Sequence, residues 1–337
     1  MENPKVSIII PTYNRANYLE QAINSVLAQT FQDYELVVLD NASTDNTSEV
    51  VRKFRDERFQ YIKNEINIGP INNFNKGLKV ARGDFVIIFH DDDIMAPELV
   101  EEEVKILNEN EDVVLVASNV ELIDEKGKTI QNKLLSIDQD IIFEKYEYIV
   151  KRLKNDILLP CPSVMLRKNF LDVNNLIFES EKGPAADTYL WFKINLSDKL
   201  LYLVSRPLLK YRIHSGQDSF RNDYYVWLSH FRISHDIIAN NNLYHLVPEL
   251  KIRASNFLVK ILFVQYLFNR IDKDNLKNAL YNLRKEKFWS DKLTLDTKIL
   301  ILLSQNFPKL AKNLVLLRRI VRKYPAFLKR IFRKEME

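Results

Sequence analysis

The sequence of 337 residues predicts an α/β fold with a Rossmann-like, mostly parallel sheet flanked by helices and with an α-helical extension at its carboxyl end. Apolar runs at 6–10 and 36–39 are typical of strands buried on both faces of a parallel sheet. Segments with helical spacing separate such runs, and this alternation indicates a doubly wound sheet. After about residue 220 the strand signals fade, and long helical segments rich in Leu, Ile, Phe and Tyr follow.

The elements of the sheet are expected in order along the first hundred residues. The strand 6–10 ends in the polar loop 11–15, and the apolar residues of the next segment recur on one helical face. The elements that follow are a strand at 36–39, a helix at 49–54, a strand at 59–62, a helix at 71–81 and a strand at 85–89.

Three consecutive carboxylates, Asp91, Asp92 and Asp93, follow the last of these strands. The carboxyl end of a parallel strand is where such a sheet presents its ligand-binding loops. Adjacent carboxylates repel one another, and hard oxygen ligands favour Mg²⁺ or Mn²⁺. The cluster therefore predicts a divalent-cation site. The alternatives are a solvated acidic turn and the N-terminus of a helix that begins at 94–98.

Five motifs in order resemble the glycosyltransferases of family 2, inverting enzymes of the GT-A fold that use nucleotide-sugar donors. Their order and spacing within the first hundred residues make the resemblance specific. Asn67, Gly69, Asn75 and Gly77 are expected to shape loops and packing. The motifs are Ser7–Arg15, Val38–Asp45, Asn67-x-Gly69 with Asn75-x-Gly77, Arg82-Gly83-Asp84 and the acidic cluster.

The resemblance implies a donor site formed by the first two loops. Asp40 corresponds to a position that accepts a hydrogen bond from the nucleobase, and a carboxylate there favours uracil or thymine, hence a UDP- or dTDP-sugar. A turn-forming Asp is the alternative. Pro11, Thr12 and Tyr13 resemble the wall that lines base and ribose. Arg15 is expected to reach a phosphate or to cap the helix.

The same resemblance implies a Mn²⁺ or Mg²⁺ cofactor. Asp92 corresponds to the family's main metal ligand. Asp91 and Asp93 flank it, Asp93 as a further metal ligand and Asp91 as part of the donor site, and one of these two is expected to contact the ribose or a metal-bound water. The family often has Asp where His90 stands, so His90 is a departure. A single His beside a core strand is either a structural residue or a ligand.

Inverting transfer also needs a base that accepts the proton of the attacking hydroxyl, and a carboxylate usually serves. The segment 183–191 resembles the family's Glu-Asp-x-x-x-Trp run, which assigns Asp187 as the catalytic base. Ala186 replaces the preceding Glu of that run. A helix cap is the alternative role for Asp187.

The segment 210–219 resembles the end of the family's catalytic domain. Arg212 is expected to contact the pyrophosphate, and His214 the pyrophosphate or the metal. The polar stretch 215–219 is expected either to close over the donor as a lid or to form an ordinary surface turn.

Composition predicts a cytoplasmic enzyme. The single Cys161 cannot form an intrachain disulfide, which suggests a reducing compartment. No signal peptide is expected, because the first residues lead directly into a strand. The apolar stretch 257–268 is too short to span a bilayer, and the sequence has no Gln-x-x-Arg-Trp motif. These observations favour single-sugar transfer over processive synthesis in the membrane.

The expected organisation is a catalytic domain at 1–220, with a donor half at 1–118 and an acceptor half at 119–220, and a helical region at 221–337. The segment 309–334 has ten Lys or Arg and no acid, whereas the whole chain has 49 basic and 45 acidic residues. Such an amphipathic tail predicts peripheral attachment to an anionic membrane, each basic residue adding up to about 1 kcal/mol. A solvated basic face is the alternative.

Nucleic-acid binding is not expected, because no recognition module accompanies the basic tail. The helical region is also a candidate homodimer face or a part of the acceptor site.

The expected function is metal-dependent, inverting hexosyl transfer to a glycan or a lipid-linked glycan in surface polysaccharide synthesis, with acceptor contacts from loops between about 118 and 184. One alternative is a binding protein of the same fold that transfers nothing. A sugar nucleotidyltransferase is the other, although the loop 11–15 lacks the glycines typical of that class.

Overall fold

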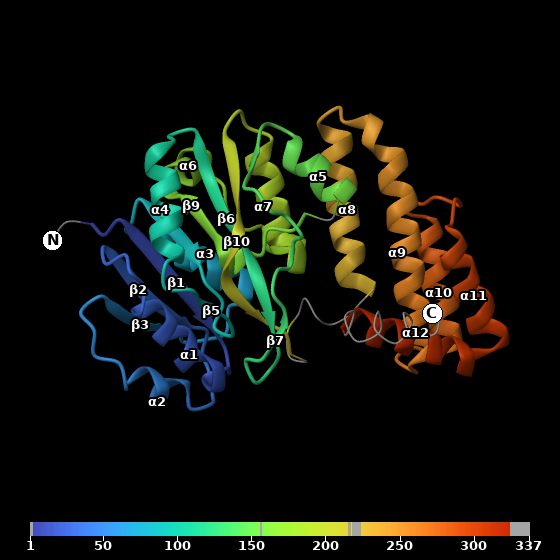
Figure 1. Ribbon diagram of the computed structural model, residues 1–337, viewed down its shortest axis with the longest axis horizontal. Helices are drawn as coiled ribbons and strands as arrows, with labels where there is room; N and C mark the ends of the chain where they lie inside the picture. Colours follow the sequence, from blue (N-terminus) through green and yellow to red (C-terminus); the bar gives the residue numbers. More distant parts are fainter. Residues whose placement is uncertain (1–2, 156, 215–216, 218–223, 324–337) are drawn as a thin grey trace, which may run out of the picture. The chain divides into compact units, whose positions relative to one another are not determined.

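The computed structural model describes residues 3–155, 157–214, 217 and 224–323. The chain divides into two compact units, Met1–Phe220 and Arg221–Glu337. Figure 1 shows that the first unit is a sheet with helices packed on it and that the second consists of helices.

The first unit is built on one sheet whose strands follow the order β3-β2-β1-β4-β9-β6-β10-β5. The strands β3, β2, β1 and β4 are parallel to their neighbours, and β6 is parallel to β10. β9 runs antiparallel to β4 and β6, and β5 runs antiparallel to β10. The predicted mostly parallel α/β sheet is confirmed. The bounds are β1 Val6–Thr12, β2 Tyr34–Asp40, β3 Phe59–Lys63, β4 Phe85–Ile88, β5 Ile94–Met95, β6 Val113–Ile123, β9 Val164–Arg167 and β10 Leu200–Arg212, with β7 Thr129–Gln131 beside β6 and β8 Ile141–Phe143 beside β10.

Helices connect these strands and cover their apolar side chains (Figure 1). In α1, Leu19, Ile23 and Val26 are fully buried against the sheet, as their spacing predicts. The bounds are α1 Ala16–Leu27, α2 Thr47–Val51, α3 Pro70–Val80, α4 Leu99–Glu109, α5 Glu147–Asn155, α6 Lys168–Val173 and α7 Ala186–Asn195, with 3₁₀ turns at η1 Cys161–Ser163 and η2 Ser180–Ala185.

The core lies around β1 and β2, in which every residue is buried. Two glycines let neighbouring elements approach these strands. A Cβ on Gly77 would lie 2.7 Å from Cγ2 of Ile9, and one on Gly83 would lie 2.7 Å from the backbone nitrogen of Ser7. Asn75 exchanges two hydrogen bonds with the backbone of Phe178, at 2.7 and 3.0 Å. These residues shape loops and packing, as predicted.

Two local features were not predicted. The segment after Asp93 forms the short strand β5, so the alternative of a helix N-terminus there does not hold, and α4 begins only at Leu99. Between residues 118 and 184 the loops alternate with regular elements, among them β9 between β4 and β6. The short run 164–167 gives a weak strand signal by itself, and its pairing with residues far away in the sequence stabilises it.

In the second unit, α8, α10, α11 and α12 all contact α9. None of the helices in the described ranges is both long and apolar enough to cross a bilayer. The bounds are α8 Tyr224–Asn240, the 3₁₀ turn η4 Tyr244–Leu246, α9 Val247–Leu267, α10 Lys273–Arg284, α11 Leu295–Asn306 and α12 Pro308–Lys323.

Candidate active site

The acidic cluster occupies a buried turn at the carboxyl end of β4. Asp91, Asp92 and Asp93 are 6%, 4% and 0% exposed. This burial excludes a solvated acidic turn, and the strand β5 directly after Asp93 excludes a helix N-terminus. Buried carboxylates need partners of opposite charge or hydrogen-bond donors, because desolvation of an isolated charge is expensive.

Asp92 has such partners from two distant parts of the chain. Nη1 of Arg15 donates a hydrogen bond of 2.5 Å to its Oδ2, and Nε2 of His214 lies 2.8 Å from the same oxygen. The Arg15 and His214 nitrogens are themselves 2.9 Å apart. The loop after β1, the turn after β4 and the segment after β10 therefore meet at one carboxylate oxygen.

Asp93 and His90 complete a set of ligand atoms that fits a divalent cation. Atoms of His90, Asp92 and Asp93 lie within 4.8 Å of one another. Within the described ranges, Oδ2 of Asp93 and Nε2 of His90 are buried and have no hydrogen-bond partner. Two carboxylates and an imidazole are ligands that Mn²⁺ accepts. His214, beside Asp92, is a further candidate ligand.

The carboxylates differ in their electrostatic environments. Burial raises the pKa of Asp91 to about 7, and the charge of Asp92 adds to this effect. The same two causes raise the pKa of Asp93 well above its ordinary value. Burial also opposes ionisation of Asp92, but the hydrogen bond with His214 and the positive charges nearby hold its pKa below the ordinary value. Asp92 is thus the carboxylate that stays ionised most readily.

Arg212 supports this turn from behind. It is 1% exposed, its Nε donates to the carbonyl of Asp92 at 2.7 Å, and its backbone N–H donates to Asp93 at 2.8 Å. Its Nη2 donates to Gln21 at 2.8 Å. Contact with pyrophosphate stays a prediction for Arg212, and this geometry favours a positioning role.

Gln217 belongs to the predicted lid or turn at 215–219, but it had been assigned no role of its own. Its Nε2 donates to the carbonyl of Arg212 and lies 3.4 Å from Oδ2 of Asp92. Of the predicted lid, residues 215, 216, 218 and 219 lie outside the described residues.

Asp40 ends β2 and is fully buried. Its Oδ1 accepts the backbone N–H of Ser43 at 2.7 Å, its Oδ2 accepts the hydroxyl of Tyr61 at 2.6 Å, and Lys63 lies 3.6 Å away. Burial and the hydrogen bond to Asp40 raise the pKa of Tyr61 to about 12, so this hydroxyl stays protonated and donates. Tyr61 was missed, although an aromatic hydroxyl in the neighbouring strand was visible in the sequence.

The predicted wall of base and ribose joins the ends of β1 and β2. Pro11 and Thr12 are buried in β1, whereas Tyr13 is 44% exposed and is accessible for stacking. The next residue, Asn14, has a positive φ of 53° and bonds to the second loop. Its Oδ1 accepts the backbone N–H of Thr44 at 2.8 Å.

Asp187 lies in the first turn of α7, one residue after its start, and the N-cap is Ala185. It is half-buried, and its Oδ1 accepts the backbone N–H of Thr188 at 2.5 Å. Burial raises the pKa of Asp187 above its ordinary value. Asp187 is thus not the N-cap residue, although its carboxylate accepts a free N–H group of the first turn, and catalysis stays a prediction.

Aromatic contacts connect α7 to the acidic cluster. The ring of His90 packs on Phe74, Phe74 on Phe178 and Phe178 on Trp191 of α7, with centroids 5.9, 5.5 and 6.1 Å apart. Burial raises the pKa of the Cys161 thiol far above its usual range, and the charges of Asp187 and Asp93 raise it further. The negative charges of both carboxylates therefore disfavour ionisation of this one buried thiol.

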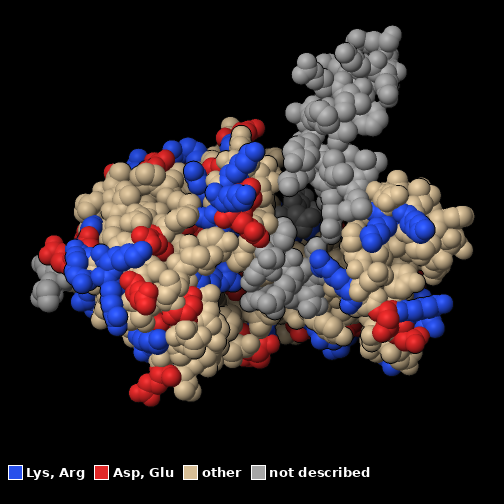
Figure 2. Space-filling view, turned by 90° about the horizontal axis from the view of Figure 1, so that it is seen from below, with Lys and Arg blue, Asp and Glu red and all other residues tan. Residues whose placement is uncertain are grey.

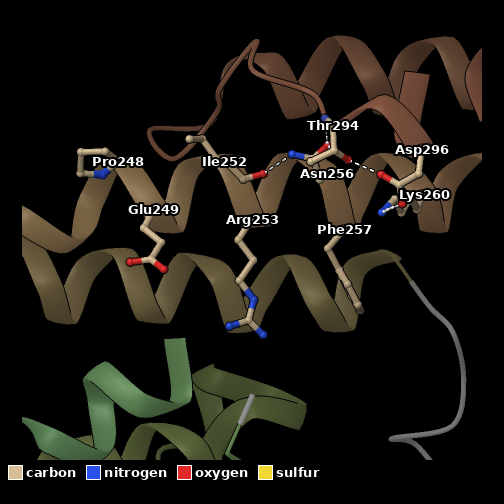
Figure 3. Close-up of a pocket in the computed structure, with 9 residues that line it drawn as sticks. All are labelled: Pro248, Glu249, Ile252, Arg253, Asn256, Phe257, Lys260, Thr294 and Asp296. Atoms are coloured by element: carbon tan, nitrogen blue, oxygen red, sulfur yellow. Dashed lines mark hydrogen bonds and ion pairs between the residues drawn. The ribbon is translucent and has the colours of Figure 1, made fainter. Parts of the chain in front are cut away.

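A cavity of about 570 Å³ lies elsewhere, in the second unit. Figure 3 shows it along α9, with Arg253 and Phe257 on one side and the hydrogen-bonded pair Asn256 and Thr294 on the other. None of the predicted site residues lines it. The cavity is therefore separate from the candidate active site.

The first unit is thus an α/β domain with a buried acidic cluster at the carboxyl edge of its sheet. The profile of glycosyl transferase family 2 matches residues 7–173. An uncharacterized glycosyltransferase of Methanocaldococcus jannaschii is 31% identical over 219 residues, which cover 63% of this chain and 72% of that protein. The chain belongs to glycosyltransferase family 2, as its motifs predicted.

Other relatives differ in length. An uncharacterized glycosyltransferase of Rickettsia felis is 31% identical over 79% of this chain, but the match covers only 43% of that protein. One from Haemophilus influenzae is 28% identical and covers 96% of this chain and 98% of its own length. The similarity to the latter therefore includes the helical unit.

Solved structures share the fold. Staphylococcus aureus TarS in complex with UDP has a TM-score of 0.56 and 22% identity, covering 81% of this chain and 75% of that one. The mannosyltransferase PcManGT from Pyrobaculum calidifontis, in complex with GDP-Man and Mn²⁺, has a TM-score of 0.52 and 16% identity, covering 97% and 89%. The GT-A fold predicted from the motifs is confirmed.

Proposed function

We propose that this glycosyltransferase moves a single sugar, with inversion, from a nucleoside-diphosphate donor to a glycan or lipid-linked glycan acceptor in surface polysaccharide synthesis. The observation that supports this most directly is the buried carboxylate of Asp92 bound by both Arg15 and His214 at the carboxyl edge of the sheet. Buried acids and a fixed guanidinium at this edge suit a cation and a pyrophosphate.

The proposed cofactor is Mn²⁺ or Mg²⁺, held by Asp92 and Asp93 with His214 or His90. When bound, such a cation neutralises the charge that develops on the departing nucleoside diphosphate. Arg15, already fixed beside Asp92, is placed to bind a phosphate oxygen, and its planar guanidinium suits that contact. Arg212 orients the turn through its bonds to Asp92 and Asp93.

Asp187 is the proposed base. Its half-buried carboxylate has a raised pKa, so it holds a transferred proton more readily than a solvated carboxylate does. It would accept the proton of the acceptor hydroxyl as that oxygen attacks the anomeric carbon from the face opposite the leaving group. A protein that only bound the donor would not need this group.

Uridine is the first candidate for the donor base, with thymidine as the alternative. Asp40 and Tyr61 form a hydrogen-bonded pair at the carboxyl end of β2, and Tyr13 offers an exposed ring. TarS has been solved with UDP and with UDP-GlcNAc, which supports uridine. The complex of PcManGT with GDP-Man and Mn²⁺ is the reason to test guanosine as well.

The protein is further proposed to attach peripherally to the cytoplasmic face of the membrane through the basic segment 309–334, where a lipid-linked acceptor is found. On the side shown in Figure 2, the basic and acidic side chains of the first unit are interspersed. The excess of positive charge in the sequence is instead concentrated near its carboxyl end.

Calorimetric titration tests the donor site. UDP and panels of UDP-, dTDP- and GDP-sugars are titrated with and without Mn²⁺ into wild type, His90→Ala and His214→Ala. Loss of a metal ligand is expected to weaken Mn²⁺ binding by at least about 10-fold. Nucleotide binding without any metal dependence in wild type would contradict the proposed cofactor, and no binding at all would contradict the donor site.

A further inference from the structure

The second unit has an apolar surface that folding leaves uncovered. Six large apolar side chains of this unit are between 45% and 75% exposed. They lie on α11, on α12 and at the junction between these helices, and we call them the α11–α12 face. They are Leu295, Ile299, Leu302, Phe307, Leu310 and Leu314. An uncovered apolar cluster of this kind on a soluble protein marks a site of contact with a partner or a membrane.

The spacing of these residues places them along continuous helical faces. Leu295, Ile299 and Leu302 are four and three residues apart, which aligns them on one face of α11. Leu310 and Leu314 are four residues apart on α12. Phe307 lies between the two helices, at the C-cap of α11. The cluster thus consists of one face of α11 and one face of α12, with Phe307 at the junction between the helices.

The fully buried residues of α11 are small and polar. Thr297 and Ser304 are buried at 0% and 1% exposure, and the hydroxyl of Ser304 donates to the carbonyl of Leu300 within the helix. Leu300 and Ile301, on the same side of the helix, are partly buried. In α12 the small Ala311 is buried while Leu310 and Leu314 are exposed. Both helices therefore carry large apolar residues on the exposed side, where a helix that is complete in water carries polar ones.

The charged side chains near the α11–α12 face are either basic or, in the case of the one acid of α11, part of an ion pair. The single acid within α11, Asp296, accepts a hydrogen bond from Lys260 at 2.6 Å. Lys298 and Lys309 are exposed beside the face. In the sequence, the following residues up to Lys334 contain further Lys and Arg and no acid. An anionic surface complements this charge, whereas a second copy of the chain would bring like charges together.

We propose that the α11–α12 face lies in the interfacial region of an anionic lipid bilayer, with its apolar side chains inserted and its lysines against the headgroups. This inference extends the proposed peripheral attachment from the basic tail to a folded surface. The inference depends on the proposed membrane attachment and does not depend on the proposed transfer reaction. Helices with an apolar side and flanking basic residues bind such surfaces in the plane of the membrane.

Vesicle flotation of the full chain tests the proposal. Wild type is expected to float with vesicles of phosphatidylcholine and phosphatidylglycerol. Ile299→Asp/Leu302→Asp is expected to lose binding by at least about 10-fold, because each substitution removes inserted apolar surface and adds repulsion. Leu314→Asp on α12 is expected to weaken binding as well, so the proposal stays testable if one variant does not fold.

Tyr281→Asp is the matched control. Tyr281 is 61% exposed on α10 and Leu302 is 59% exposed, so the same charge replaces an equally exposed side chain outside the face. This control is expected to float like wild type. Calorimetric binding of UDP with Mn²⁺ is measured on every variant, because it reports on the donor site independently of the membrane.

Three outcomes would overturn the proposal. Wild type that stays unbound to anionic vesicles excludes the membrane as the partner. Equal flotation of the Ile299→Asp/Leu302→Asp variant and wild type assigns attachment to the basic tail alone. A wild-type dimer in sedimentation velocity that the substitutions convert to monomer, without vesicle binding, would make the face a protein interface.

Discussion

The strand β1 of the first unit and the helix α11 of the second unit differ in how far their apolar side chains are buried. In β1 every residue from Val6 to Thr12 is buried, and the polar groups gather beyond the carboxyl ends of the strands. In α11 Leu302 is 59% exposed, although α9 of the same unit buries Leu258 and Leu262. Folding thus buries the apolar side chains of β1 and leaves apolar side chains of α11 in contact with solvent.

The contrast concerns the roles of apolar residues in stability and in binding. In the first unit the buried core around β1 and β2 holds the acidic cluster in a fixed geometry at the edge of the sheet. In the second unit the exposed apolar residues of α11 and α12 form the surface for which we propose membrane binding. Substitutions at equivalent chemical groups should therefore have very different effects in the two units.

The largest effect is expected for Asp92→Ala. It removes the carboxylate that binds Arg15 and His214, so metal-dependent donor binding and turnover should both be lost, with donor affinity falling by more than about 100-fold. Titration of UDP in the presence of Mn²⁺ measures this loss of donor affinity. Asp112→Ala, which removes a surface carboxylate paired with Lys199, is the control. Tight metal-dependent UDP binding by Asp92→Ala would remove Asp92 from the site.

Asp187→Asn should separate binding from transfer. The amide keeps the shape of the side chain but cannot accept the proton, and loss of a general base typically lowers the rate by about 10²–10⁴-fold. Donor titration should be unchanged. Asp198→Asn is the control, because Asp198 pairs with Lys145 at the surface. Near-normal transfer to a glycan acceptor by Asp187→Asn would place the base elsewhere.

Ile9→Ala and Leu302→Ala compare the two kinds of apolar residue directly. Ile9 is fully buried in β1, so its truncation should lower the free energy of unfolding by about 2–5 kcal/mol. Leu302 is 59% exposed, so its truncation should change that free energy by less than about 0.5 kcal/mol. Urea unfolding followed by circular dichroism measures both. An equally large loss for Leu302→Ala would mean that α11 is covered in solution.

Glu103→Gln should have the smallest effect among these core changes. Glu103 of α4 is fully buried, neither of its carboxylate oxygens has a partner in the described ranges, and burial raises its pKa well above the usual 4.5. Between the unfolded and folded pKa values the native state holds a proton that the unfolded state has released. Stability should therefore fall as pH rises through that window.

The glutamine variant should lack this pH dependence. Relative to wild type, it should gain about 1–3 kcal/mol as pH rises from about 4.5 to 8. Thermal unfolding at several pH values measures the difference. Parallel curves for the two proteins would show that Glu103 does not carry the expected proton.

The alternation of apolar runs and helical segments was sufficient to predict the parallel strands, and the resemblance of the five motifs was sufficient to predict the family. The carboxyl ends of parallel strands meet at one edge, so Asp40 and Asp92 could be assigned to that edge from local patterns alone. The antiparallel strand β9 was not predictable, because its four residues become a strand only through pairing with β4 and β6. The motif was sufficient to assign Arg212 to the site, but it did not predict that Arg212 is buried behind the acidic turn.

The sequence by itself determined which side chains carry the chemistry, since residue type and spacing are local properties. Only the tertiary structure decided their partners. It placed Arg15 and His214 at the same oxygen of Asp92, and it placed the hydroxyl of Tyr61 where it donates a hydrogen bond to Asp40. It also left the apolar side chains of one side of α11 exposed. Each of these features depends on contacts between residues that are far apart in the chain. The periodicity of apolar residues within one segment does not specify which other segment packs on it.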